Sequence, residues 1–166
     1  MALSTTTATA IIDQMITVIE ALTPSSSEVS PKTNAPFRRA PRRAPLTTWA
    51  KGGSAVLRRF DIVPTGPRVD PGVMDPAATL LERELAVSVA YPDLPALYGT
   101  NEHDDMHTLA EADAVKLRDA IVSPGNHVAG QLAAYVTQSS LDAATDDVWL
   151  LRLTVLVQYY QAQTIT

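Results

Sequence analysis

The stretch Val148–Gln161, with the sequence VWLLRLTVLVQYYQ, decides the fold of this chain. Apolar residues occupy every second position from Trp149 to Tyr159, which is the period of a β-strand with one buried face. The alternate positions mix polar and apolar side chains: Leu150, Arg152, Thr154, Leu156, Gln158 and Tyr160. Such a face is typical of a surface that packs on a helix or a neighbouring subunit. At about 3.3 Å per residue the strand is about 45 Å long, so we expect its end to project from the body.

Three earlier segments also predict strands. Leu57–Val63 and Leu81–Tyr91 alternate apolar and polar residues, and Leu132–Gln138 is a weaker strand followed by a polar turn over Ser139–Asp147. The second face of the Leu81–Tyr91 strand carries Glu84, Ala86, Ser88 and Ala90. Because most of these side chains are small, a helix could lie close against that face.

Two segments predict amphipathic helices, Thr5–Leu22 and Asp105–Val122. Their apolar stripes are Ile12, Met15, Ile16, Ile19 and Leu22 in the first and Met106, Ala110, Ala114, Leu117 and Ile121 in the second. The order of elements predicts a single α+β domain over residues 1–166. Its sheet is expected to be four-stranded and mostly antiparallel, with the N-terminal helix and the central helix packed on it.

A long Pro/Arg-rich segment, Thr23–Trp49, separates the first helix from the first strand. Its X-Pro steps favour extended backbone, so we expect residues 23–56 to form an extended basic arm or loop. Nine of the 13 Lys and Arg residues fall between Lys32 and Arg68, where Asp61 is the only acid, so that stretch carries 9 − 1 = +8. The other 4 bases and 17 acids carry −13, which gives the net charge of −5.

Composition removes several classes of function. The chain has no cysteine, which excludes disulfides and thiolate chemistry. Its first residues lack the basic region of a signal peptide, and no apolar run approaches the roughly 20 residues that cross a bilayer. We therefore expect a protein that is used in a cytoplasm or in a particle assembled there.

The run His103–His107 (HDDMH) is the one sequence cluster with the spacing of metal ligands. It lacks a nearby third histidine and a glutamate placed as a general base, and aspartates are common at a helix start, so a solvated helix entrance is the preferred interpretation. Ser139 and Ser140 lack the flanking glycines of a nucleophile elbow, and Gly52-Gly53 lacks the spacing of a phosphate loop. We expect no enzymatic activity and no cofactor, with a metal-dependent enzyme as a remaining alternative.

Two arginine pairs, Arg38-Arg39 and Arg42-Arg43, dominate the basic segment. Guanidinium groups bind phosphates, which would fit nucleic acid, and they bind carboxylates, which copies of this chain offer. We favour carboxylate pairing between subunits, because a free-standing DNA-binding domain is usually basic overall. Together with neighbouring arginines and the end of the last strand, the candidate interaction residues are Arg38, Arg39, Arg42, Arg43, Arg58, Arg59, Tyr159 and Tyr160.

Over most of its length the sequence resembles the tail terminator, or tail completion, proteins of long-tailed bacteriophages. The resemblance rests on TATAIIDQMITVIEAL (7–22), RRFDIV (58–63), ERELAVSVAYPD (82–93), LAEADAVKLRDAIV (109–122) and DVWLLRLTVLVQYYQ (147–161). The segment Thr23–Trp49 departs from the family because it is longer than expected.

This resemblance implies a virion structural protein of the tail or neck, assembled in the host cytoplasm. Family members form a six-fold ring that caps a finished tail tube, stops its polymerisation and offers a surface to the head connector. The implied partners are further copies of the chain, the tail tube protein and a head connector or neck protein. DNA would cross the channel without specific binding, and no membrane is involved. Two alternatives remain, a head-completion or adaptor protein of the neck and a nucleic-acid-binding module that uses the basic arm.

Overall fold

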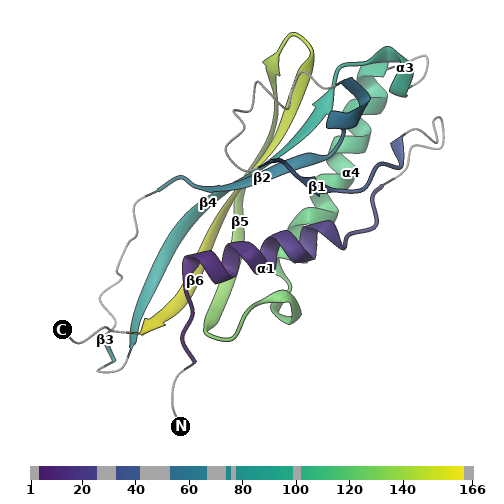
Figure 1. The fold of residues 1–166 in the computed structure, drawn as a ribbon. Helices are drawn as coiled ribbons and strands as arrows, with labels where there is room; N and C mark the ends of the chain where they lie inside the picture. Colours follow the sequence, from purple (N-terminus) through teal and green to yellow (C-terminus); the bar gives the residue numbers. More distant parts are fainter. Residues whose placement is uncertain are drawn as a thin grey trace.

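The computed structural model describes residues 4–25, 33–41, 53–66, 74–75, 78–98 and 102–162. Helices lie against one face of a twisted sheet (Figure 1). The elements in chain order are α1 (Ala8–Glu20), β1 (Arg38–Arg39), η2 (Gly53–Val56), β2 (Arg59–Pro64), β3 (Met74–Asp75), β4 (Ala78–Pro92), α3 (Pro95–Tyr98), α4 (Glu102–Val122), η3 (Pro124–Asn126), β5 (Gln131–Thr145) and β6 (Val148–Ala162). None of the described helices is both long and apolar enough to cross a membrane.

The sheet has the strand order β1-β2-β4-β6-β5, and β3 pairs with β4 outside this path. β4 and β6 pair antiparallel over 15 residues each, from Ala78 opposite Ala162 to Pro92 opposite Val148. The end of β6 was expected to project from the body, but it is paired with the start of β4. The predicted α+β class is confirmed, and the main strands are antiparallel as expected. The sheet is nevertheless mixed and larger than the predicted four strands, because β1 adds to β2 in parallel and β3 adds to β4.

The main core lies between the helices and one sheet face. The strands contribute the buried residues Leu81, Leu85, Val87, Val89, Tyr91, Leu151, Leu153, Val155, Val157 and Tyr159. The helices contribute Ile11, Met15, Ile16, Ile19, Met106, Leu109, Ala110, Leu117 and Ile121. The alternation predicted for the last strand and the two predicted helical stripes are thus confirmed, with Ile11 as an additional core residue of α1.

The sequence predicted that a helix would pack on the β4 face that carries Ala86, Ser88 and Ala90. The helices pack instead on the opposite face of the strand. They cover Leu85 and Tyr91, because larger apolar side chains gain more from leaving water. On the small-residue face, Ala90 belongs to a second and smaller buried cluster, with Ala40, Val56, Val148 and Leu150 as its other members. Ala78 and Pro92 at the two ends of β4 are buried as well, and the side chains of this face between Leu80 and Ser88 are half-buried or exposed.

Strand β5 is longer than the sequence predicted. The segment Ser139–Asp147 was expected to be a polar turn, but the strand continues to Thr145 and only the next two residues turn. The reason is the partner strand, because β6 offers backbone hydrogen bonds along this whole length and that pairing outweighs the weak β-propensity of serine and aspartate. The pairing is interrupted by three register shifts.

The described part of the basic segment packs on the body. β1 pairs with β2 in parallel, and Phe37 is only 1% exposed. Thr33 and Ala40 are also buried. Burial of the apolar side chains Phe37 and Ala40 holds the segment on the body. The high content of proline and arginine gave no indication of this burial. Arg42 and Arg43 lie outside the described residues.

The segment before α1 crosses the chain at Gly130. The Thr6 N–H donates to the Tyr160 carbonyl at 2.7 Å, and the Tyr160 N–H donates to the Gly130 carbonyl at 2.9 Å. Gly130 has a φ of 90°, and an added Cβ would lie 2.7 Å from the carbonyl carbon of Thr5. Only glycine fits both the backbone conformation and the close approach.

Candidate functional site

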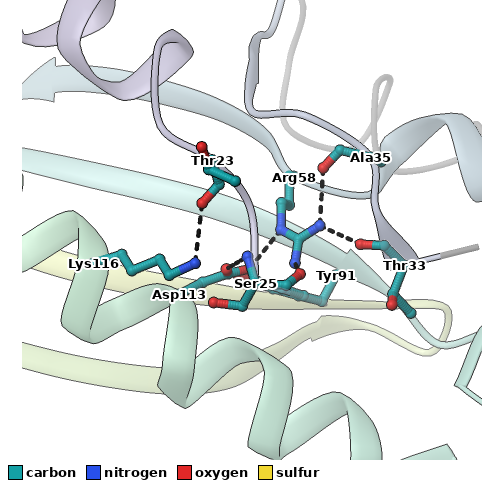
Figure 2. A network of polar contacts seen from close by, with 8 residues as sticks. All are labelled: Thr23, Ser25, Thr33, Ala35, Arg58, Tyr91, Asp113 and Lys116. Carbon is teal, nitrogen blue, oxygen red and sulfur yellow. Dashed lines mark hydrogen bonds and ion pairs between the residues drawn. The ribbon is translucent and has the colours of Figure 1, made fainter. Parts of the chain in front are cut away.

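Arg58 is the centre of a buried polar network that joins distant segments of the chain (Figure 2). Its Nε donates to Oδ2 of Asp113 at 2.6 Å, and both side chains are fully buried. The Tyr91 hydroxyl donates to the same carboxylate oxygen at 2.9 Å, and the Ser25 N–H donates to Oδ1 at 3.1 Å. A buried charge is tolerated only when it is paired and hydrogen-bonded, and this carboxylate meets both conditions.

The terminal nitrogens of Arg58 bind the chain that leads into β1. Nη2 donates to the Ser25 carbonyl at 2.5 Å, and Nη1 donates to the carbonyls of Thr33 and of Ala35, the latter at 2.8 Å. The guanidinium carbon also lies 5.5 Å from the centre of the Phe37 ring. One side chain therefore fastens the segment after α1 to both the sheet and α4, as the view of the network shows (Figure 2).

The backbone of Arg58 is as unusual as its side chain. Its φ of 58° lies in the left-handed region, which costs a residue with a side chain roughly 1 to 3 kcal/mol. Its N–H donates to the Ala90 carbonyl at 2.9 Å, and its carbonyl accepts from the Arg38 N–H at 3.1 Å. These bonds hold the turn between η2 and β2 and aim the guanidinium at α4.

Burial raises the pKa of Tyr91 well above its ordinary value of 10.0. The negative charge of Asp113 raises the pKa further, while the positive charge of Arg58 lowers it in part. The hydroxyl therefore remains protonated and acts as a donor. Arg58, Tyr91 and Asp113 are all buried, and their hydrogen bonds join α4, the sheet and the segment after α1; we call this network the clamp.

The eight candidate interaction residues fall in different places. Arg58 and Tyr159 are buried within the subunit, where Arg58 is part of the clamp and Tyr159 is part of the core. Arg38 is exposed, while Arg39, Arg59 and Tyr160 are half-buried. Arg42 and Arg43 cannot be placed, since they lie outside the described residues.

Sequence reasoning missed the partner of Arg58. The clue was the position of Asp113, which is three residues after Ala110 and four before Leu117 and so lies on the apolar stripe of α4. An acid on the buried face of a helix requires a partner of opposite charge.

The histidine cluster lies at the start of the long helix. The run His103–His107 lies inside α4, and the described residues include no group of three His, Cys, Asp or Glu side chains that could hold a metal ion. The ring of His107 packs edge-on against Trp149, with 5.2 Å between ring centres.

A groove runs along the sheet edge between α4 and β5. Two adjoining depressions of about 510 and about 260 Å³ are lined there by side chains from both elements. We call this surface the edge groove and define it by Val115, Arg118, Val122, Tyr135, Val136 and Ser139. Val115 is 52% exposed, Tyr135 is 49% exposed, and Leu132 beside them is also exposed. Apolar side chains gathered in this way mark a surface for another macromolecule.

The described residues thus form an α+β fold with a mixed sheet and a buried ion pair. Among them, no strand pairs with the outer edge of β5. No protein-family model matches the sequence, and a search of curated proteins finds no match. Among solved structures it is similar to a chain of one titled "Virion of native gene transfer agent (GTA) particle". The two chains are 13% identical with a TM-score of 0.48, over 92% of this chain and 94% of the other. A similarity at this level carries no conclusion about function.

Proposed function

We propose that this chain is a virion structural protein without enzymatic activity, a tail terminator subunit that forms a ring on the end of a tail tube. The observation that carries the proposal is the open edge of the sheet. β5 is 15 residues long, and its outer side faces no other strand in the part of the chain that the structure describes. It contains neither proline nor lysine, and Asp142 is its single charged residue. Edge strands that must stay single are usually short, protected by such residues, or interrupted by β-bulges; β5 is long and lacks such residues, and its three register shifts are separated by regular pairs with β6.

Two further observations support the proposal. The order of helices and strands follows the segments that carry the resemblance to tail terminator proteins. The best-connected polar network of the subunit is buried and holds its own chain together, rather than lining a pocket for a small molecule. A head-to-tail contact through unlike edges closes into a ring when its rotation divides a full turn.

The mechanism is self-association combined with a surface complementary to the tube end. A ring seated on the last layer of tube subunits would occupy the surface to which further subunits add, and its free side would meet the head connector. The charge of −13 outside the basic stretch would disfavour binding of DNA that crosses the ring.

The test is the mass of the purified protein in solution, alone and with isolated tail tubes, by light scattering after size exclusion. Six copies of the 17.8 kDa chain give 6 × 17.8 = 106.8 kDa. Negative-stain images of the same samples should show rings at tube ends. A protein that stays monomeric both alone and with tubes would overturn the proposal.

A head-completion or adaptor protein of the neck is the alternative within the same class. The discriminating measurement is the choice of partner, since such a protein would bind isolated portal assemblies and leave tail tubes unbound. A nucleic-acid-binding module would instead bind DNA with an affinity that falls steeply as salt increases.

A further inference from the structure

We propose that the outer edge of β5 in one subunit pairs with the β1–β2 edge of a second copy of the chain, with Arg38 of that copy beside Asp142 on the sheet face away from α4. This inference rests on the proposed function, because it names the two surfaces through which a ring would close.

The register places opposite charges at the two ends of one row across the sheet. Arg38 is the partner of Arg59 in the β1–β2 pair. Phe60, the next residue, pairs with Val89, so Arg59 falls beside Ala90. Ala90 pairs with Leu150, and Leu150 pairs with Asp142 at the other edge. A second copy that continued the sheet in the same order would bring its Arg38 next to Asp142.

Strand direction is compatible with this contact. β1 runs parallel to β2, and each following step in the order β2-β4-β6-β5 is antiparallel. β5 therefore runs opposite to β1, and the new neighbours would pair antiparallel (Figure 1).

The edge near β5 is acidic. The charged residues on β5 and on the exposed face of α4 around the edge groove are Glu111, Arg118, Asp119 and Asp142, which sum to 1 − 3 = −2. Asp146 and Asp147, in the turn after β5, are also exposed. A cationic partner surface is therefore favoured there.

The opposite edge is basic. The charged residues of β1 and β2 are Arg38, Arg39, Arg59 and Asp61, which sum to 3 − 1 = +2. Nε of Arg39 is buried and makes no hydrogen bond within the described part of the chain. A buried donor of this kind gains when a partner supplies an acceptor.

The exposed apolar side chains also fall at these two edges. Among the described residues, the large hydrophobics with high exposure are Val63, Val115, Val122, Leu132 and Tyr135. Four of them lie on α4 and β5, and Val63 lies on β2, beyond the two residues that β1 covers. Among the described residues, the second copy thus offers a stretch of β2 backbone, from Asp61 to Pro64, that β1 leaves uncovered.

The experiment exchanges the charges. Arg38→Glu and Asp142→Arg should each weaken self-association at least roughly tenfold, because each places like charges together. The double variant with both changes should recover association, and so should an equimolar mixture of the two single variants, in which every contact is again paired. Association constants come from sedimentation equilibrium. Asp13→Arg, an exposed position on α1, makes the same change of charge away from both edges and should have no effect.

The outcomes separate this inference from the proposed function. Single variants that associate like the original chain, or a double variant that fails to recover, would overturn the contact, while rings of the unaltered chain on tube ends would leave the proposed function standing. An unaltered chain that never associates would overturn the proposed function itself. Thermal unfolding of every variant checks that the subunit remains folded.

Discussion

Nε of Arg58 lies 2.6 Å from Oδ2 of Asp113, and neither side chain is exposed to solvent. The pair joins the start of β2 to the middle of α4, two elements that are 55 residues apart at this contact. Through the carbonyls of Ser25, Thr33 and Ala35, the same guanidinium holds the chain that crosses from α1 to β1. The sheet, the long helix and the basic segment therefore meet at one ion pair.

Asp113→Ala should lower the free energy of unfolding by roughly 3 to 5 kcal/mol, because it leaves the Arg58 charge buried without its partner. Asp119→Ala is the matched control on the same helix, since its side chain is 69% exposed, and its effect should stay within about 0.5 kcal/mol. Urea unfolding followed by circular dichroism gives both values.

Replacing both partners tests the same explanation from the other direction. The variant Arg58→Met with Asp113→Leu should be more stable than Asp113→Ala alone, because no unpaired charge remains inside. Equal losses in Asp113→Ala and Asp119→Ala would show that the ion pair does not hold the fold.

Tyr91→Phe should change how stability depends on alkaline pH. An unfolded tyrosine loses its proton near pH 10, whereas the raised pKa of Tyr91 keeps the proton in the folded state. Above about pH 10 the unfolded state therefore binds fewer protons, and the free energy of unfolding falls as pH rises toward the folded pKa. The contribution is complete below about pH 10. Unfolding curves from about pH 9 to about pH 11 should fall less steeply for the variant, and parallel curves would contradict the assignment.

Gly130→Ala should destabilise the subunit by roughly 1 to 3 kcal/mol, since alanine would be strained at a φ of 90° and would press on Thr5. Gly125→Ala is the control, because its nearest contact is a serine hydroxyl at 3.9 Å and its φ is not positive. Differential scanning calorimetry should show a lower melting temperature for the first variant only. Similar melting temperatures for both would mean that the N-terminal segment moves aside without cost.

Phe37→Ala should cost roughly 3 to 5 kcal/mol, because the ring lies in the core although the sequence around it is that of a loop. Arg38→Ser should stay within about 0.5 kcal/mol, since this side chain is exposed. Chemical denaturation of both variants measures the difference. A mild effect of Phe37→Ala would support an arm that is independent of the body, as the composition of the segment indicated.

The strands of the sheet centre could be read from the sequence because local pattern and final environment agree there. In β6 every second residue from Leu151 to Tyr159 is apolar and buried, so period alone identifies the strand and its inner face. The second half of β5 could not be found in this way. Ser139 and Ser140 are strand residues because β6 lies beside them, and that partner is distant in the chain.

The clamp was hidden for a similar reason. Arg58 stands in a run of basic residues, and composition cannot separate one arginine that pairs internally from others that face solvent. The left-handed backbone at position 58 could not be predicted either, because the residue there is arginine and not the glycine or asparagine that usually adopts this conformation. The position of Asp113 on the apolar stripe of α4 predicts a basic partner. The sequence offers nine bases between Lys32 and Arg68, and only the folded structure shows that the partner is Arg58.

The Ser25 and Thr33 carbonyls both accept from the Arg58 guanidinium, so the two chain ends that border residues 26–32 are held at a fixed separation by a group outside that stretch. Lengthening the polypeptide between those anchors adds only a slowly growing closure entropy, about 0.6 kcal/mol for each doubling. The distance between Ser25 and Thr33 is therefore set by the Arg58 side chain and not by the number of residues between them.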